Sequence, residues 1–209
     1  MADRTSTDPN TPRLSAVAPC YNEEESITEF VRRLSAACKT CVSDSYEIVL
    51  VDDGSSDRTW EIISGLTLTD DHIVAIKLLR NHGHQLAASA GLSNARGQRV
   101  LLIDADLQDP PELLPQMMAV MDAGAEVVYG QRRTRAGESR LKLKTAEMFY
   151  QLLAKLSTVN IPKNTGDFRL MSRRVVDLLC SMPERQRFIR GMVAWVGGNQ
   201  VAFAYDRDA

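Results

Sequence analysis

The sequence predicts an α/β fold with a mostly parallel central sheet and helices on both of its faces. Short apolar runs alternate along the chain with helical segments of about 10–15 residues, which is the pattern of βαβ units. Several of these runs are apolar throughout, as expected for strands that are buried on both faces. Polar clusters follow four of the runs directly, and sites in such sheets lie at the carboxyl ends of the strands.

The first 130 residues supply five expected strands and the helices between them. The strands are predicted at 14–19, 46–51, 73–79, 99–103 and 127–129, and three of the helices at 24–38, 58–66 and 85–95. A fourth helix is expected to begin after Asp109. Asp109 would be its N-cap, Pro110 its first residue and Glu112 the reciprocal capping partner.

The rest of the chain differs in character. Residues 131–144 contain six basic residues and one acidic residue around Gly137, which predicts a mobile loop. Residues 1–13 are polar and predict a flexible tail, with one domain over 14–209. The remaining expected elements are an amphipathic helix at 141–156, a strand at 166–171, helices at 173–181 and 187–196, and a strand at 200–205.

Composition and charge narrow the class of protein. The 209 residues are 44% hydrophobic and 25% charged, which excludes disorder for the bulk of the chain. No apolar run reaches the ~18 residues that span a bilayer, and no signal peptide is evident, so a reducing cytosolic compartment is the default. Residues 1–130 include 20 acidic and 10 basic residues, whereas residues 131–209 include 7 acidic and 15 basic residues. The basic part indicates an anionic partner, but no pattern for binding nucleic acid is present.

Asp104-Ala105-Asp106 is the most informative motif. Two carboxylates directly after a buried strand repel each other unless a cation lies between them, and Gln108 adds a neutral oxygen nearby. Mg²⁺ or Mn²⁺ suits such oxygen ligands and also takes phosphate oxygens. The alternative is an Asp-rich turn that only caps the next helix.

A second cluster, Asp52-Asp53-Gly54-Ser55, follows the second strand. One interpretation is that the cluster is only a turn and a helix N-cap. The other is that Asp53 accepts hydrogen bonds from a nucleobase or ribose. The chain has no glycine-rich dinucleotide or P-loop motif, so a nucleotide would bind through carboxylates and a metal. His82 and His84 lack further ligands nearby, and we expect His84 to start a helix rather than to bind metal.

Five motifs together resemble glycosyltransferase family 2, and more narrowly its polyprenyl-phosphate branch, which includes dolichyl-phosphate mannose synthases and bacterial undecaprenyl-phosphate sugar transferases. The similarity runs from about residue 14 to 205. Its motifs are APCYNEEE at 18–25, VDDGSSDRT at 51–59, RNHGHQ at 80–85, DADLQDPPE at 104–112, and GDFRL at 166–170 with RFIRG at 187–191 and Trp195.

The resemblance implies a GT-A fold, a Rossmann-like three-layer sandwich, and an inverting transferase that moves a sugar from a UDP- or GDP-sugar to a polyprenyl phosphate. The donor would contact Pro19, Tyr21, Glu23, Asp53, Arg80, Asp104 and Ala105. Asp104, Asp106 and Gln108 would hold Mg²⁺ or Mn²⁺. Arg132 and Arg133 would lie near the phosphates, and Asp106, Asp167, Arg132 and Arg133 would serve catalysis. Independently of the resemblance, bidentate arginines suit an anionic acceptor phosphate, and Arg132, Arg133, Arg169 and Arg190 are the candidates.

Members of this branch commonly continue into interfacial and transmembrane helices, so the resemblance implies that residues 14–209 form the catalytic domain of a protein acting at the cytoplasmic face of a membrane.

Two other functions remain open from the residues alone. One is a nucleotidyltransferase, although the phosphate loop that it would need is missing. The other is a non-catalytic module that binds a membrane surface through the basic part. The sequence is compatible with a homo-oligomer but carries no exposed heptad stripe that specifies one.

Overall fold

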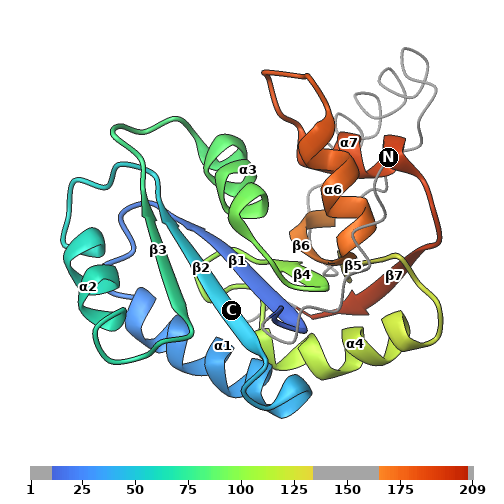
Figure 1. Cartoon of the computed structure of the whole chain (residues 1–209), viewed down its shortest axis with the longest axis horizontal. Coiled ribbons are helices and arrows are strands. Elements are labelled where there is room, and N and C mark those ends of the chain that lie inside the picture. The colour runs from blue at the N-terminus through green and yellow to red at the C-terminus, as the bar shows by residue number, and fades with distance from the viewer. Residues whose placement is uncertain (1–10, 134–164, 207–209) are drawn as a thin grey trace.

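A sheet forms the middle layer of the chain in its computed structural model, which describes residues 11–133 and 165–206. Within these ranges the sheet has seven strands in the order β3-β2-β1-β4-β6-β5-β7 (Figure 1). Strand β6 runs antiparallel to its neighbours β4 and β5, and the other pairs are parallel. The strands are β1 (Leu14–Cys20), β2 (Tyr46–Asp52), β3 (Ile73–Lys77), β4 (Arg99–Leu102), β5 (Val127–Arg132), β6 (Thr165–Ser172) and β7 (Gln200–Tyr205).

Helices cover both faces of this sheet. On one face lie α1 (Ile27–Val42), α2 (Thr59–Leu66) and α4 (Leu114–Asp122), the last preceded by a short 3₁₀ turn, Pro111–Leu113. On the other lie α3 (His84–Asn94), α6 (Arg173–Ser181) and α7 (Ile189–Val196). The prediction of a mostly parallel sheet between two helical layers is therefore confirmed.

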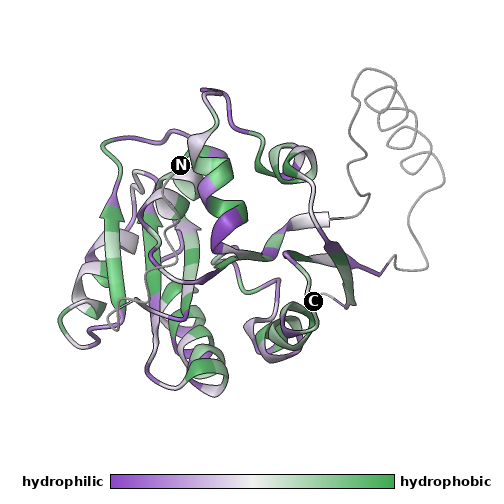
Figure 2. Ribbon diagram, turned by 45° about the vertical axis from the view of Figure 1, so that its right-hand side comes forward, coloured by the Kyte–Doolittle hydropathy of each residue, from purple (hydrophilic) through white to green (hydrophobic). Residues whose placement is uncertain are grey.

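Two apolar cores separate the layers, because successive side chains of a strand point to opposite faces. In β2, Ile48 and Leu50 belong to the core under α1, whereas Val49 and Val51 belong to the core under α3. Figure 2 shows hydrophobic residues concentrated in the central strands. Gly91 lets α3 approach the sheet closely, because a Cβ atom there would lie 2.3 Å from Val17 Cγ1.

One predicted helix start is wrong. Asp109 does not cap the helix that follows it: the 3₁₀ turn and α4 show no side-chain cap. Asp109 is instead fully buried and accepts hydrogen bonds from Tyr205 and Arg132. Glu112, expected as the reciprocal partner, bonds to Arg33 of α1. At this position, hydrogen bonds to partners that are distant in sequence determine the orientation of the carboxylate, and the local capping pattern does not.

The other strands and helices expected within the described residues are found with shifted ends, and residues 1–10 of the predicted tail lie outside the described ranges. Helix α1 begins at Ile27 rather than at 24, and β5 continues to Arg132. Most of the predicted basic loop at 131–144 and all of the predicted helix at 141–156 lie outside the described residues. Within the described ranges, no helix is both long enough and apolar enough to cross a membrane.

Candidate active site

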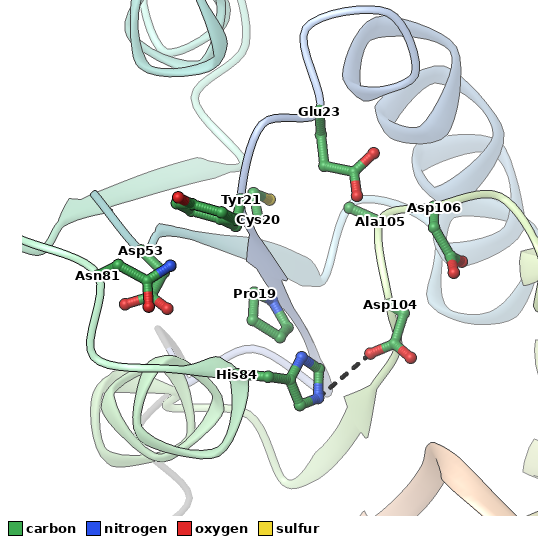
Figure 3. Close-up of a pocket in the computed structure, with 10 residues that line it drawn as sticks. All are labelled: Pro19, Cys20, Tyr21, Glu23, Asp53, Asn81, His84, Asp104, Ala105 and Asp106. Atoms are coloured by element: carbon green, nitrogen blue, oxygen red, sulfur yellow. Dashed lines mark ion pairs between the residues drawn. The ribbon is translucent and has the colours of Figure 1, made fainter. Parts of the chain in front are cut away.

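A cavity of about 260 Å³ lies at the carboxyl ends of β1, β2 and β4. The expected convergence of polar clusters on this edge of the sheet is thus found. Figure 3 shows Tyr21, Asp53 and Asn81 on one side of the cavity and His84, Asp104 and Asp106 on another. The lining residues are Pro19, Cys20, Tyr21, Glu23, Asp53, Asn81, His84, Asp104, Ala105 and Asp106.

Asp53 holds the loop that leads into α3. One carboxylate oxygen accepts the backbone N–H of His82 and the other that of Gly83, each at 2.8 Å. The adjacent Gly54 has φ +69°, and a Cβ atom there would lie 2.4 Å from the Arg80 carbonyl carbon. Only glycine fits this close approach, so the Asp53-Gly54 turn packs directly on the Arg80-Asn81 loop, and Asp53 and Asn81 line the same cavity.

Asp104 and Asp106 form the opposite wall. Asp104 Oδ1 is buried and has no hydrogen-bond partner, whereas Asp106 Oδ1 accepts the backbone N–H of Gln108 at 3.0 Å. Burial raises the pKa of Asp104 to about 6, and the charges of Asp167 and Asp106 add to this rise while His84 opposes it. A buried carboxylate oxygen that accepts no hydrogen bond, beside a second carboxylate, is a place where a divalent cation would fit.

The carboxylate pair would not enclose such a cation. No cluster of three or more His, Cys, Asp or Glu side chains suited to a metal occurs in the described parts of the chain. Gln108 is exposed and does not line the cavity, so the structure does not bring its side chain to the pair. Mg²⁺ typically keeps several waters and takes one or two carboxylates plus phosphate oxygens, which matches a two-carboxylate site.

His84 was expected only to start a helix, and it does so at the first residue of α3. Its side chain does more, because Nε2 lies 3.0 Å from Asp167 Oδ2 and 3.4 Å from Asp104 Oδ1. The hydrogen bond with Asp167 raises the pKa of His84. A polar residue at a helix start beside the sheet edge was the signal that sequence reasoning passed over.

Asp167, on β6, is 4% exposed and is surrounded by donors. Its Oδ1 lies 3.2 Å from Arg190 Nε and 3.5 Å from an Arg169 nitrogen. Burial alone would raise the pKa of Asp167, but the hydrogen bond from His84 and the charges of Arg169 and Arg190 outweigh it and lower the pKa to about 2. Burial also lowers the pKa of Arg169 to about 10, with Asp167 opposing that change. Asp167 is therefore an ionised group at neutral pH.

Arg132 and Arg133 end β5 in different surroundings. Arg132 contacts Asp109 and the Tyr205 hydroxyl, each at 3.4 Å, and its guanidinium packs against Gly166. Arg133 is exposed and forms an ion pair with Asp206 at 3.2 Å. Arg132 thus lies next to the residue preceding Asp167, whereas Arg133 points to the surface.

The structure brings most of the candidate residues together. Asp167, Arg169 and Arg190 join the cavity wall through His84. Arg80 is exposed, bonds to the Asn81 carbonyl at 3.2 Å and does not line the cavity. Seven of the expected residues line the cavity directly: Pro19, Tyr21, Glu23, Asp53, Asp104, Ala105 and Asp106.

Comparison with known proteins agrees with this arrangement. The profile described as glycosyl transferase family 2 matches residues 15–179, which include the turn after β1, the Asp53 turn and the Asp104–Asp106 pair. The chain belongs to glycosyltransferase family 2. The resemblance inferred from the motifs is therefore confirmed.

Two relatives illustrate how similar the chain is to curated members. The uncharacterized glycosyltransferase YkcC of Bacillus subtilis is 45% identical over 194 residues, covering 93% of this chain and 60% of the relative. The bactoprenol glucosyl transferase of Shigella phage SfV is 43% identical over 195 residues, covering 93% of this chain and 63% of the relative. The chain therefore spans less than two thirds of the length of these relatives.

Solved structures show the same fold at low sequence identity. TarS 1-349 of S. aureus superposes with a TM-score of 0.63 at 19% identity, covering 93% of this chain and 59% of TarS. The mannosyltransferase PcManGT of Pyrobaculum calidifontis, solved with GDP-Man and Mn²⁺, superposes with a TM-score of 0.64 at 20% identity, covering 92% of this chain and 55% of PcManGT. The expected GT-A fold of the glycosyltransferases is confirmed.

Proposed function

We propose that this chain is the catalytic part of a metal-dependent transferase that moves a sugar from a nucleotide-sugar to a polyprenyl phosphate at a membrane surface. The observation that carries the proposal is the buried carboxylate of Asp104 beside Asp106 in a cavity at the sheet edge, whose Oδ1 accepts no hydrogen bond and has His84 Nε2 at 3.4 Å. The relatives named as bactoprenol glucosyl transferases support the acceptor, because bactoprenol is a polyprenol.

The donor would occupy the cavity with its nucleoside toward Tyr21 and Asp53. Asp104 and Asp106 would then hold Mg²⁺ or Mn²⁺ on the diphosphate, with Gln108 reaching the ion only after a side-chain movement. When bound, the metal supplies positive charge that stabilises the departing nucleoside diphosphate. The neighbour solved with GDP-Man and Mn²⁺ supports this use of a metal in the fold.

The acceptor phosphate would be bound by arginines on the Asp167 side of the cavity. Arg190 and Arg169 already flank Asp167, and Arg132 packs against Gly166. Arginine suits this task because its planar guanidinium matches phosphate oxygens in pairs. Arg133 lies farther out, where it would attract the acceptor rather than orient it.

The chemical step needs little acid–base assistance. A phosphate monoester has a second pKa near 6 and is already nucleophilic at neutral pH. Its oxygen would form a bond to the anomeric carbon while the bond from that carbon to the nucleoside diphosphate breaks, with the electron pair leaving on the β-phosphate oxygen. Attack opposite to the leaving group inverts the anomeric carbon. Asp167, ionised beside Arg190, would orient the sugar and the arginine.

A transfer assay with a matched pair of variants tests the proposal. The full chain would be incubated with UDP- or GDP-sugars, Mn²⁺ and a short-chain polyprenyl phosphate, and the glycolipid product measured. We expect Asp106→Asn to keep the melting temperature and to lower turnover by about 10²-fold or more, the scale of losing roughly 3 kcal/mol. Asp71→Asn, an exposed carboxylate at the other end of β3, should behave as wild type.

The other two functions give different results in the same experiment. A nucleotidyltransferase would release pyrophosphate from a nucleoside triphosphate and form no glycolipid. A binding module would attach to anionic vesicles without metal or nucleotide and would show no heat of binding for Mn²⁺ with UDP or GDP. Normal turnover of Asp106→Asn would contradict the proposed metal site.

A further inference from the structure

Gln85 joins three elements around Asp167. It is the second residue of α3, and its Nε2 donates a hydrogen bond to Asp167 Oδ2 on β6 at 2.8 Å. Its Oε1 accepts the backbone N–H of Ile189, the first residue of α7, also at 2.8 Å. One carboxamide therefore links α3, β6 and α7 across 104 positions of sequence.

The bond to Ile189 fills a gap at the start of α7. The first N–H groups of a helix have no partner within the helix and require an acceptor from elsewhere. The N-cap residue of α7, Phe188, provides no side-chain cap. Gln85 supplies an acceptor from another helix, and so fixes where α7 begins.

The start of α7 in turn places Arg190. Arg190 is the second residue of α7, and its Nε lies 3.2 Å from Asp167 Oδ1 while another of its nitrogens donates to the Thr165 carbonyl at 3.1 Å. Asp167 Oδ2 thus accepts hydrogen bonds from Gln85 and His84, whereas Oδ1 forms an ion pair with Arg190. Displacing Gln85 would remove one of the two hydrogen bonds to Asp167 Oδ2 and the acceptor at the helix turn that carries Arg190.

The chemistry of the side chain explains why glutamine stands here. The site requires one donor, for a carboxylate, and one acceptor, for a backbone N–H, at the end of a single side chain. A carboxamide has both, whereas an ionised carboxylate only accepts and an ammonium only donates. The same partners fix the orientation of the amide, because Ile189 N–H cannot accept and ionised Asp167 cannot donate.

We infer that Gln85 is a positioning residue that holds Asp167 and Arg190 in the geometry needed for sugar transfer. This inference rests on the proposed function. Gln85 itself does not line the cavity, so its removal should act through Asp167 and Arg190 and leave the nucleotide wall at Asp53 in place.

Two substitutions separate this role from simple structural support. Gln85→Ala removes both hydrogen bonds. Gln85→Glu keeps the length of the side chain and an acceptor for Ile189, but sets a second carboxylate against Asp167. A role limited to accepting the N–H at the start of α7 predicts that Gln85→Glu is the milder change for turnover, whereas a role in positioning Asp167 predicts that it is the more damaging one. Gln116→Ala and Gln116→Glu, at an exposed glutamine of α4, are the matched controls.

The expected result is a loss of turnover of about tenfold or more in Gln85→Ala, since small misplacements around a reacting centre cost this much, and a larger loss in Gln85→Glu. Affinity for the nucleotide-sugar should change less than twofold, and the Gln116 variants should match wild type. The inference is overturned if Gln85→Glu is the milder variant, or if donor affinity falls in step with turnover.

A second measurement does not depend on activity. Amide hydrogen exchange at Ile189 should become about tenfold faster in Gln85→Ala and stay near the wild-type rate in Gln85→Glu, because only the alanine lacks an acceptor. If the wild-type chain transfers no sugar, the proposed function fails, and this exchange still tests the contact. Unchanged exchange in Gln85→Ala would overturn the inference in either case.

Discussion

The hydroxyl of Tyr205, at the end of β7, donates a hydrogen bond to Asp109 Oδ1 at 2.5 Å, although 96 positions separate the two residues. Asp109 is fully buried, and its other carboxylate oxygen lies 3.4 Å from an Arg132 nitrogen. Burial and the hydrogen bond to Asp109 raise the pKa of Tyr205 to about 12, so the hydroxyl is a donor at neutral pH. The last strand thereby anchors the segment that follows the Asp104–Asp106 pair.

Removing this hydroxyl should destabilise the fold. Tyr205→Phe leaves a buried carboxylate short of one partner, which typically costs about 1–3 kcal/mol. We expect the free energy of unfolding, measured by urea denaturation, to fall by that amount. Tyr129→Phe is the control, because the Tyr129 side chain is only partly buried and no hydrogen bond of its hydroxyl is found among the described residues. Equal losses in both variants would show that the Asp109 contact is not the cause.

Asp109 also shows what the sequence could not reveal. The local pattern Asp-Pro-Pro-Glu predicts a capped helix start, and a helix does follow. The role of Asp109 depends on its two partners, Arg132 and Tyr205. Both are distant from it in sequence, and no local pattern around Asp109 predicts these contacts. Local spacing therefore predicted the element correctly and its capping residue incorrectly.

The cavity was predictable for a related reason. Residues directly after parallel strands must meet at one edge, so the order of strands along the chain is enough to place Asp53, Asp104 and Asp106 together. His84 and Gln85 could not be placed in this way, because a helix start offers no sequence signal for which side chains turn toward a neighbouring strand. Their contacts with Asp167 depend on how α3 packs beside β6 and α7.

Asp53 should affect stability and nucleotide binding together. Its carboxylate accepts two backbone N–H groups, and Asp53→Asn turns one of those acceptors into a donor. We expect the free energy of unfolding to fall by about 1–3 kcal/mol, and the affinity for UDP or GDP to fall because Asn81 moves with the loop.

Thermal melts and calorimetry measure the two effects of Asp53→Asn, with Asp71→Asn as an exposed control. A lower melting temperature with unchanged nucleotide affinity would assign Asp53 to the loop alone. Lower affinity with an unchanged melting temperature would show that the two hydrogen bonds to the loop contribute little to folding.

Binding of the metal should depend on pH through Asp104. Burial raises the pKa of this carboxyl to about 6 in the metal-free protein, and a cation can be bound only by the ionised form. The affinity for Mn²⁺ with a nucleotide-sugar should therefore rise as pH increases through about 6, by about tenfold per unit below this value for one released proton. Protonated His84 repels a cation and acts in the same direction.

Calorimetry between pH 5 and pH 7.5, in buffers of different ionisation enthalpy, would count the protons released on binding. His84→Gln should keep the dependence that arises from Asp104, so the two contributions can be separated. An affinity that does not change over this range would argue against Asp104 as a ligand.

The two arginines that end β5 should differ in their effect on turnover. Asp109 and Tyr205 hold Arg132 against Gly166, the residue before Asp167. Arg132→Ala should therefore lower turnover on a polyprenyl phosphate by about 10²-fold or more, the scale of losing roughly 3 kcal/mol of transition-state stabilisation. Arg133 is exposed and paired with Asp206, and surface pairs contribute about 0–1 kcal/mol, so Arg133→Ala should cause a much smaller loss. Binding to anionic vesicles should decrease only slightly in both variants, because many other basic residues remain in positions 131–209. The opposite pattern, with vesicle binding lost and turnover on a soluble short-chain acceptor retained, would assign these arginines to membrane attachment instead of sugar transfer.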